Sequence, residues 1–336
     1  MEKLTIMQRG KIENLLNERK WNLKEFSKVT GIDGRILNEI IKGEIPISEE
    51  EYEELCRFIQ NEDDSGLINY HEPIIIVSWA RKGGNGKTTV ATNLAYDLAQ
   101  MGYKTLAVDG DSQCDLTSTL YPQYMYLEER TIYDAMLRRR DIRPYIIDTD
   151  YDNLSIVSGS QFTEELERVL INMPSKIAVD TFKDCFEGVM EDNFYDFIIV
   201  DLDKSMGLFN NAILSAASYV LVLAECSFFS VKALIPVKER LEQIQKENKQ
   251  LKCLGLVFNR VNTRKNEVKK AKADAKCYFA PYQIMNNYLS NDSNVEKSQR
   301  VGVPLDVYAN SSKVNKQMHL LTEEILNKIR MDIEEE

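Results

Sequence analysis

A glycine- and lysine-rich segment at residues 82–89 contains the residue types that bind nucleotide phosphates. It reads Lys-Gly-Gly-Asn-Gly-Lys-Thr-Thr and follows an apolar run at residues 74–79. Glycines let backbone N–H groups turn toward phosphate oxygens, and the dipole of a following helix favours negative charge there. Lys87 is placed to reach the β- and γ-phosphates, and the Thr88 hydroxyl to ligate Mg²⁺. The predicted nucleotide-binding residues are Gly83, Gly84, Asn85, Gly86, Lys87, Thr88 and Thr89.

Aspartates follow two further apolar runs. Asp109 and Asp111 come after residues 105–108, and Asp201 comes after residues 197–200. An aspartate after a strand is often only a helix cap. Two with this spacing downstream of a phosphate loop favour a functional role, because phosphoryl transfer needs mainly positioning and charge stabilisation.

The elements around these residues alternate between short apolar runs and helical periods. Strands are predicted at residues 74–79, 105–108, 154–157, 197–200, 219–224 and 254–258. Continuous apolar runs of this kind are typical of a parallel sheet covered on both faces. The predicted fold class is therefore α/β, a doubly wound, mostly parallel sheet, with a small all-α domain before it.

Composition limits the classes of protein. The chain has 336 residues, 43% hydrophobic and 28% charged, with a formal net charge of −11. No apolar run approaches the ~20 residues that span a bilayer, so we expect a cytoplasmic protein. Six scattered cysteines without a C-x-x-C pair argue against structural zinc, an iron–sulfur cluster or a disulfide framework, and we expect mostly buried thiols.

The first 60 residues are predicted to form a separate domain, joined by an acidic linker at residues 61–73 to a domain at residues 74–336. Two short helices, at residues 21–31 and 35–43, are separated by a glycine-containing turn, which is similar to the helix-turn-helix of Cro/CI-type repressors. Arg35, Asn38 and Lys42 would face outward toward DNA. A helical protein-docking module is the alternative.

A second basic region lies at residues 232–276, where the net charge is +8 in an otherwise acidic chain. Sparse aromatic residues favour phosphate contacts on duplex DNA over stacking on single strands. A solvated helix face is the alternative. The candidate DNA contacts here are Arg264, Lys265, Lys269, Lys270 and Lys272.

The motif at residues 82–89, followed by the aspartate motifs in this order, resembles the ParA/MinD group of P-loop ATPases with a deviant Walker A box. The resemblance covers about residues 74–330 and implies roles for individual residues. Lys82 would reach across a dimer to the partner's phosphates, Asp111 would position the attacking water, and Asp109 and Asp201 would belong to the Mg²⁺ network. Asn259, Arg260 and Pro304 would lie around the adenine base. The chain departs from the family after Asp201, where prolines are usual and Leu-Asp-Lys-Ser stands instead.

This resemblance implies a DNA-segregation ATPase that is cytoplasmic and nucleoid-associated. ATP and Mg²⁺ would close a homodimer, the dimer would bind nucleoid DNA, and a ParB-like centromere-binding protein would trigger hydrolysis. The N-terminal domain would read an operator or centromere-like site. Two alternatives remain: a transcriptional regulator switched by ATP with little turnover, and an electron-transfer ATPase, which would need a cysteine-ligated cluster.

Overall fold

The computed structural model describes residues 34–42, 72–122, 130–262 and 267–334. The chain divides into two compact units, residues 1–69 and residues 70–336. In the first unit the structure describes one helix, α3 (Gly34–Ile41). Its Ile40 and Ile41 are buried, as the helical pattern predicted, and Arg35 and Lys42 are exposed. The helix predicted at residues 21–31 lies outside the described residues.

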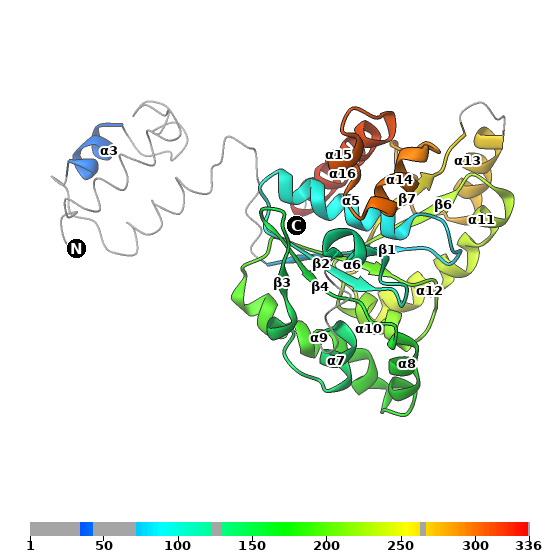
Figure 1. Cartoon of the computed structure of the whole chain (residues 1–336), viewed down its shortest axis with the longest axis horizontal. Helices are drawn as coiled ribbons and strands as arrows, with labels where there is room; N and C mark the ends of the chain where they lie inside the picture. Colours follow the sequence, from blue (N-terminus) through cyan, green and yellow to red (C-terminus); the bar gives the residue numbers. More distant parts are fainter. Residues whose placement is uncertain (1–33, 43–71, 123–129, 263–266, 335–336) are drawn as a thin grey trace. The chain divides into compact units, whose positions relative to one another are not determined.

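The second unit is built on a seven-stranded sheet in the order β3-β4-β2-β5-β1-β6-β7 (Figure 1). Its strands are β1 (Ile74–Trp79), β2 (Thr105–Gly110), β3 (Ile147–Asp148), β4 (Leu154–Val157), β5 (Phe197–Leu202), β6 (Tyr219–Glu225) and β7 (Lys252–Asn259). All neighbours pair in parallel except β3, which is antiparallel to β4. The predicted α/β class and mostly parallel sheet are confirmed. The sequence reading missed β3, because a two-residue edge strand carries no periodic signal.

Helices cover both faces of this sheet, with α5, α14, α15 and α16 on one side and α7, α8, α9, α10 and α12 on the other (Figure 1). The helices are α5 (Lys87–Gln100), α6 (Asp115–Leu120), α7 (Ile132–Leu137), α8 (Thr163–Ile171), α9 (Ser175–Asp192), α10 (Leu208–Ala216), α11 (Phe228–Lys232), α12 (Leu234–Glu247), α13 (Glu267–Tyr278), α14 (Ser293–Val301), α15 (Leu305–Ala309) and α16 (Lys313–Glu334), with a 3₁₀ turn η2 (Arg143–Tyr145). Every residue of β1, β2, β4 and β5 is buried, which explains their unbroken apolar runs.

The strand order places the phosphate loop and the aspartates at the carboxyl ends of the central strands. β1 leads past β5 to β2, whereas its neighbour β5 leads past β1 to β6, so their connections run in opposite directions, and such a switch point forms a crevice at the carboxyl ends of the strands. The register pairs Ser78 of β1 with Asp201 of β5, and Asp109 of β2 with the same Asp201. The phosphate loop and two of the predicted carboxylates therefore meet there.

Two other expectations concern cysteines and membranes. Cys114 and Cys185 are buried, whereas Cys226 and Cys253 are half-buried and Cys277 is exposed. Two of the five described cysteines are thus fully buried, so the prediction of mostly buried thiols holds only in part. No helix among the described residues is long and apolar enough to cross a bilayer.

Candidate nucleotide-binding site

The phosphate loop connects β1 to α5 and opens toward the carboxyl edge of the sheet. Gly84 and Gly86 have φ angles of +81° and +85°, a left-handed conformation that glycine adopts without strain. Gly86 is the N-cap of α5, so the free N–H groups of the first turn point into the loop. Lys87 is 7% exposed, and its carbonyl accepts a hydrogen bond from Ser78 Oγ at 3.1 Å. The segment thus has the geometry of an anion cradle.

Asn85 connects this loop to β6 and to Ser230 through hydrogen bonds. Its side chain is buried and donates to the carbonyl of Leu223 on β6 at 3.2 Å. Its Oδ1 accepts from Ser230 Oγ at 3.2 Å, and Ser230 Oγ in turn accepts from the backbone N–H of Glu225 at 3.0 Å. The sequence analysis counted Asn85 as a loop residue but missed Ser230, because nothing local in the chain links positions 145 residues apart.

Asp109 accepts hydrogen bonds that hold the segment after β2 in place. One carboxylate oxygen accepts from Thr117 N at 2.8 Å and Thr117 Oγ1 at 2.6 Å, and the other accepts from Asp111 N at 3.1 Å. Burial raises the pKa of Asp109 to about 6, although the Thr117 bonds oppose the rise. Because both oxygens already have donors, Asp109 acts in this structure as an internal support of the site.

Asp201 differs from Asp109 in its hydrogen bonding. Both of its carboxylate oxygens are buried, and among the described residues neither makes a hydrogen bond of good geometry, the Thr88 hydroxyl being the nearest donor. Burial raises the pKa of Asp201 well above its usual value, and the charge of Asp109 adds to the rise, while Lys87 and the nearby Thr88 hydroxyl lower it. A buried carboxylate without donors costs free energy unless something else satisfies it. A divalent cation beside Thr88 is such a partner, so these residues fit the Mg²⁺ that their motifs imply.

Asp111 and Lys82 stand at the mouth of the loop. Asp111 Oδ2 lies 3.9 Å from Lys87 Nζ, and its Oδ1 accepts from Gln113 N. Lys82 has a 43% exposed side chain whose Nζ lies 3.5 Å from Glu225 Oε2. Glu225 also lies 3.8 Å from Arg260 Nη1. The structure thus brings Lys82, Lys87 and Asp111 to one edge, and it adds Glu225, which no motif indicated.

Two of the residues predicted around the base, Asn259 and Arg260, lie against the phosphate loop. Asn259 Nδ2 donates to the Asn85 carbonyl at 3.0 Å, so its amide is turned onto the phosphate loop here. Arg260 has a φ of +51°, and its guanidinium lies over Gly84. Pro304 is buried, and the adjacent Leu305 N–H donates to Asn93 on α5 at 2.7 Å. An adenine role for these residues stays a prediction.

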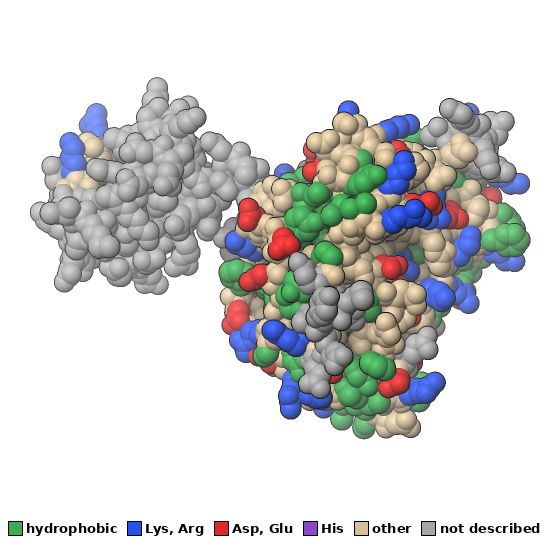
Figure 2. Space-filling view, viewed as in Figure 1, with side chains coloured by type: hydrophobic (Ala, Val, Ile, Leu, Met, Phe, Trp, Pro, Cys, Tyr) green, Lys and Arg blue, Asp and Glu red, His purple; other side chains and the backbone are tan. Residues whose placement is uncertain are grey.

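The candidate DNA contacts lie on α13, on α3, and in a segment outside the described residues. Lys269 and Lys270 are exposed on α13, and Lys272 is half-buried with Nζ 5.4 Å from the ring centre of Tyr288. Figure 2 shows blue Lys and Arg side chains at this end of the second unit, beside α11 and α13. Arg35, Asn38 and Lys42 belong to α3 or its last turn. Arg264 and Lys265 lie outside the described residues.

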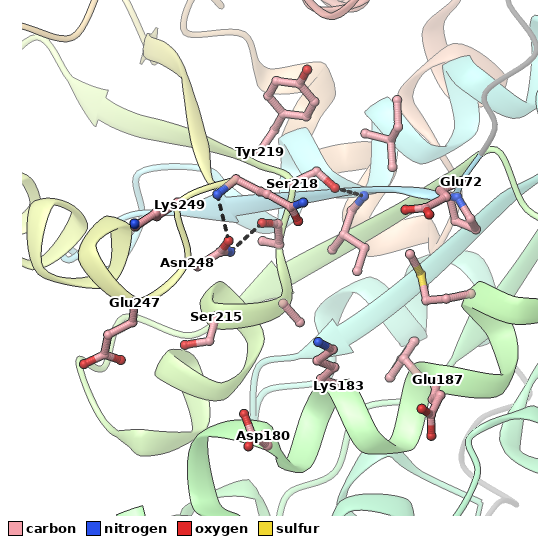
Figure 3. A pocket seen from close by; sticks show the side chains of 18 of the residues that line it. Glu72, Asp180, Lys183, Glu187, Ser215, Ser218, Tyr219, Glu247, Asn248 and Lys249 are labelled. Carbon is pink, nitrogen blue, oxygen red and sulfur yellow. Dashed lines mark hydrogen bonds between the residues drawn. The ribbon is translucent and has the colours of Figure 1, made fainter. Parts of the chain in front are cut away.

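A large hollow of about 1250 Å³ lies elsewhere, at the amino ends of β1 and β6 (Figure 3). Lysines and carboxylates alternate around it, including Lys183, Glu187 and Lys249. Asn248, which lines it, donates to the carbonyls of Leu214 and Ala217. None of the described polar atoms that lack partners belongs to its walls. This hollow is therefore separate from the phosphate chemistry at the opposite edge.

The fold and site together define a P-loop nucleotide-binding protein of the α/β class. Residues 73–253 match the model of a family described as an AAA domain, more than half of the chain. The chain belongs to this family and is an ATPase of the ParA/MinD partition type.

Individual relatives agree with this assignment. The chromosome partitioning protein ParA of Myxococcus xanthus is 27% identical over 69% of this chain and 81% of its own length. The virulence plasmid ParA family protein pGP5-D of Chlamydia psittaci is 28% identical over 75% of this chain and 93% of its own. The structure of an ATP complex of McdA from Cyanothece superposes with a TM-score of 0.67 at 19% identity, covering 76% of this chain and 96% of that one. At that identity the likeness to McdA shows the fold alone.

Proposed function

We propose that this chain segregates DNA by a cycle of Mg-ATP binding, dimer closure and hydrolysis. The observation that carries the proposal is the buried, unpartnered Asp201 carboxylate beside the Thr88 hydroxyl and the cradle at Gly86. The phosphate cradle with Asp201 supports ATP as ligand, and the chromosome partitioning protein and the plasmid ParA family protein among the relatives support DNA as cargo.

Each polar group of the site has a distinct task in this reaction. The backbone N–H groups around Gly86 and the Lys87 ammonium hold the phosphates, and Thr88 with Asp201 holds Mg²⁺. When bound, Mg²⁺ neutralises negative charge on the phosphates. Asp111 has an accessible carboxylate close to Lys87 and orients the attacking water. Asp109 keeps the Asp111 segment in place through its bond to Asp111 N.

The active dimer uses the face that carries Lys82. Beside it, Phe228 and Phe229 of α11 are 57% and 75% exposed, and their ring centres lie 5.5 Å apart. Arg81 and Phe229 line a hollow of about 380 Å³ on the same face. Exposed aromatic pairs next to a charged site support a protein interface. A second copy seated here would bring its own Lys82 toward the nucleotide.

DNA binding would involve both units. The exposed lysines of α13 contact backbone phosphates of any sequence, so affinity falls steeply with salt. In the first unit, the outward Arg35, Asn38 and Lys42 support reading of an operator or centromere-like site by a helix-turn-helix. A ParB-like protein would reset the cycle by stimulating hydrolysis.

The test measures ATP hydrolysis by the full chain, alone, with duplex DNA, and with DNA plus any small DNA-binding protein encoded beside it. We expect slow turnover that DNA and the partner accelerate. Lys87→Ala should abolish binding of a fluorescent ATP analogue. Lys82→Ala should keep monomer binding but sediment as a monomer with the analogue. A dimeric, fully active Lys82→Ala protein would contradict the shared site.

An ATP-switched transcriptional regulator is the second candidate. The loop after Asp201 favours it, because Asp203 Oδ1 is occupied by the Ser205 N–H and the usual prolines are missing. The same assay separates the two functions. A regulator would bind the analogue and its operator tightly, yet hydrolyse no ATP under any of the three conditions.

A further inference from the structure

The segment between Asp201 and α10 is held by side chains that no motif of the site includes. Asp203 Oδ1 accepts from the Ser205 N–H, which closes a tight turn. Asn210 is buried and donates to the Ser205 carbonyl at 2.8 Å and to the Asp203 carbonyl at 3.3 Å. The backbone of residues 203–207 is thus tied to the first turn of α10.

The first turn of α10 is in turn held by Glu167, which lies on α8. Glu167 Oε1 accepts from Leu208 N at 2.8 Å, and Oε2 accepts from Phe209 N at 2.9 Å. Both carboxylate oxygens therefore satisfy N–H groups at the positive end of a helix. This contact joins segments 41 residues apart in the chain.

Gly207 makes room for this carboxylate. A Cβ atom at position 207 would lie 2.5 Å from Glu167 Oε1 and 2.6 Å from Oε2. The φ of Gly207 is −80°, so any residue could adopt its backbone at that angle, and space is the reason for a glycine. The Glu167 carboxylate therefore occupies space that is free only because residue 207 has no side chain.

The residues that precede α8 contact Asp109, one of the carboxylates of the site. Before it, Gly159 packs against Asp109, since a Cβ there would lie 2.8 Å from the Asp109 carboxyl carbon. The Gly159 N–H donates to Thr117 Oγ1, which itself donates to Asp109. Residues 159–167 thus contact Thr117, which holds Asp109 in place. Through Glu167 they also contact the segment that follows Asp201.

We propose that Glu167 is a positioning residue for ATP turnover, through its contact with α10 and Gly207. It holds the segment after Asp201 in the geometry that hydrolysis needs, through its bonds to Leu208 and Phe209. The inference rests on the proposed ATPase cycle. It assigns Glu167 no contact with nucleotide, so ATP binding should not depend on it.

The test compares the full-length wild type with Glu167→Gln and with Glu165→Gln, a neighbouring exposed glutamate of α8. Four quantities are measured: kcat at saturating Mg-ATP, the Kd of a fluorescent ATP analogue, the urea midpoint, and backbone hydrogen exchange. We expect Glu167→Gln to lower kcat about tenfold or more while the Kd stays within about twofold. Hydrogen exchange at Leu208 and Phe209 should rise by a similar factor. The Glu165→Gln control should match the wild type in all measurements.

Gly207→Ala provides a second route to the same state, because its methyl group would displace the carboxylate. It should lower kcat as Glu167→Gln does, and the double variant of Gly207→Ala with Glu167→Gln should lose no more than either single one. Additive losses, an unchanged kcat in Glu167→Gln, or a parallel loss of kcat and ATP affinity would each overturn the inference. Absence of turnover in the wild type would instead overturn the proposed function.

Discussion

The buried Asp201 carboxylate makes no hydrogen bond of good geometry to the described residues, so we expect it to lower the stability of the free protein while it is needed for activity. Replacing it by asparagine removes a buried negative charge that has no donor and that faces the charge of Asp109. We therefore expect Asp201→Asn to be more stable than the wild type without nucleotide, and to lose Mg-dependent ATP hydrolysis. Active-site residues that are destabilising in the free protein commonly behave in this way.

The size of the effect follows from the cost of leaving a buried polar group unsatisfied, about 1–3 kcal/mol. The asparagine amide keeps part of that cost, so the expected gain is about 1–2 kcal/mol. For a domain of this size, that gain corresponds to a rise in Tm of about 2–4 °C.

The pH dependence has a definite sign. The folded-state pKa of Asp201 is raised, so folding favours its protonated form. The stability gained by protonation is complete below the unfolded-state pKa and is lost as pH rises through the folded-state value. Asparagine imitates the protonated form. The advantage of Asp201→Asn should therefore be larger at pH 8 than at pH 5.

The assay is thermal unfolding of both proteins at these two pH values without nucleotide, followed by ATPase measurements with Mg²⁺. Asp203→Asn is the matched control, because the Asp203 carboxylate accepts hydrogen bonds from the Ser205 N–H and Asn210. Its asparagine keeps an oxygen acceptor for both bonds, so it should show no gain in stability where Asp201→Asn gains it. An Asp201→Asn protein that melts at or below the wild-type temperature at pH 8 would refute the reasoning.

Two further predictions concern stability around the site. The hydrogen bond to Asp97 on α5 raises the pKa of His319 to about 9, against desolvation, so its contribution to stability is complete below pH 6.5 and is lost as pH rises through 9. Because the His319 side chain is 39% exposed, solvent screening reduces this contribution to about 1–2 kcal/mol. His319→Gln should lower the urea midpoint at pH 6 and leave it almost unchanged at pH 10; equal losses at both values would contradict the ion pair. Gly86→Ala should lower Tm and nucleotide affinity, since its Cβ would lie 1.7 Å from Asn259 Nδ2 and its φ is +85°. Gly83→Ala, which meets nothing within 4 Å, should keep the Tm, and an equal loss in both would disprove the steric argument.

The sheet was largely predictable from the sequence. The strands at 74–79 and 154–157 have the predicted bounds, because each is an apolar run that is buried on both faces. The predicted strand at residues 197–200 ends two residues later, at Leu202. Its last residues include Asp201, whose polar side chain marked an end to the apolar run although the backbone pairing continues.

The sequence by itself determined the phosphate loop and the parallel sheet behind it, since both depend on residues that are neighbours in the chain. Glycines set the turns, Lys87 follows them directly, and the apolar periods set the strands. Only the tertiary structure decided which carboxylate has partners. Asp109 accepts hydrogen bonds from Thr117, whereas Asp201 accepts none of good geometry from the described residues, and Glu167 occupies the space beside Gly207. The physical reason is that hydrogen bonding and desolvation depend on distances in space, and the packed sheet brings together residues that lie far apart in the chain.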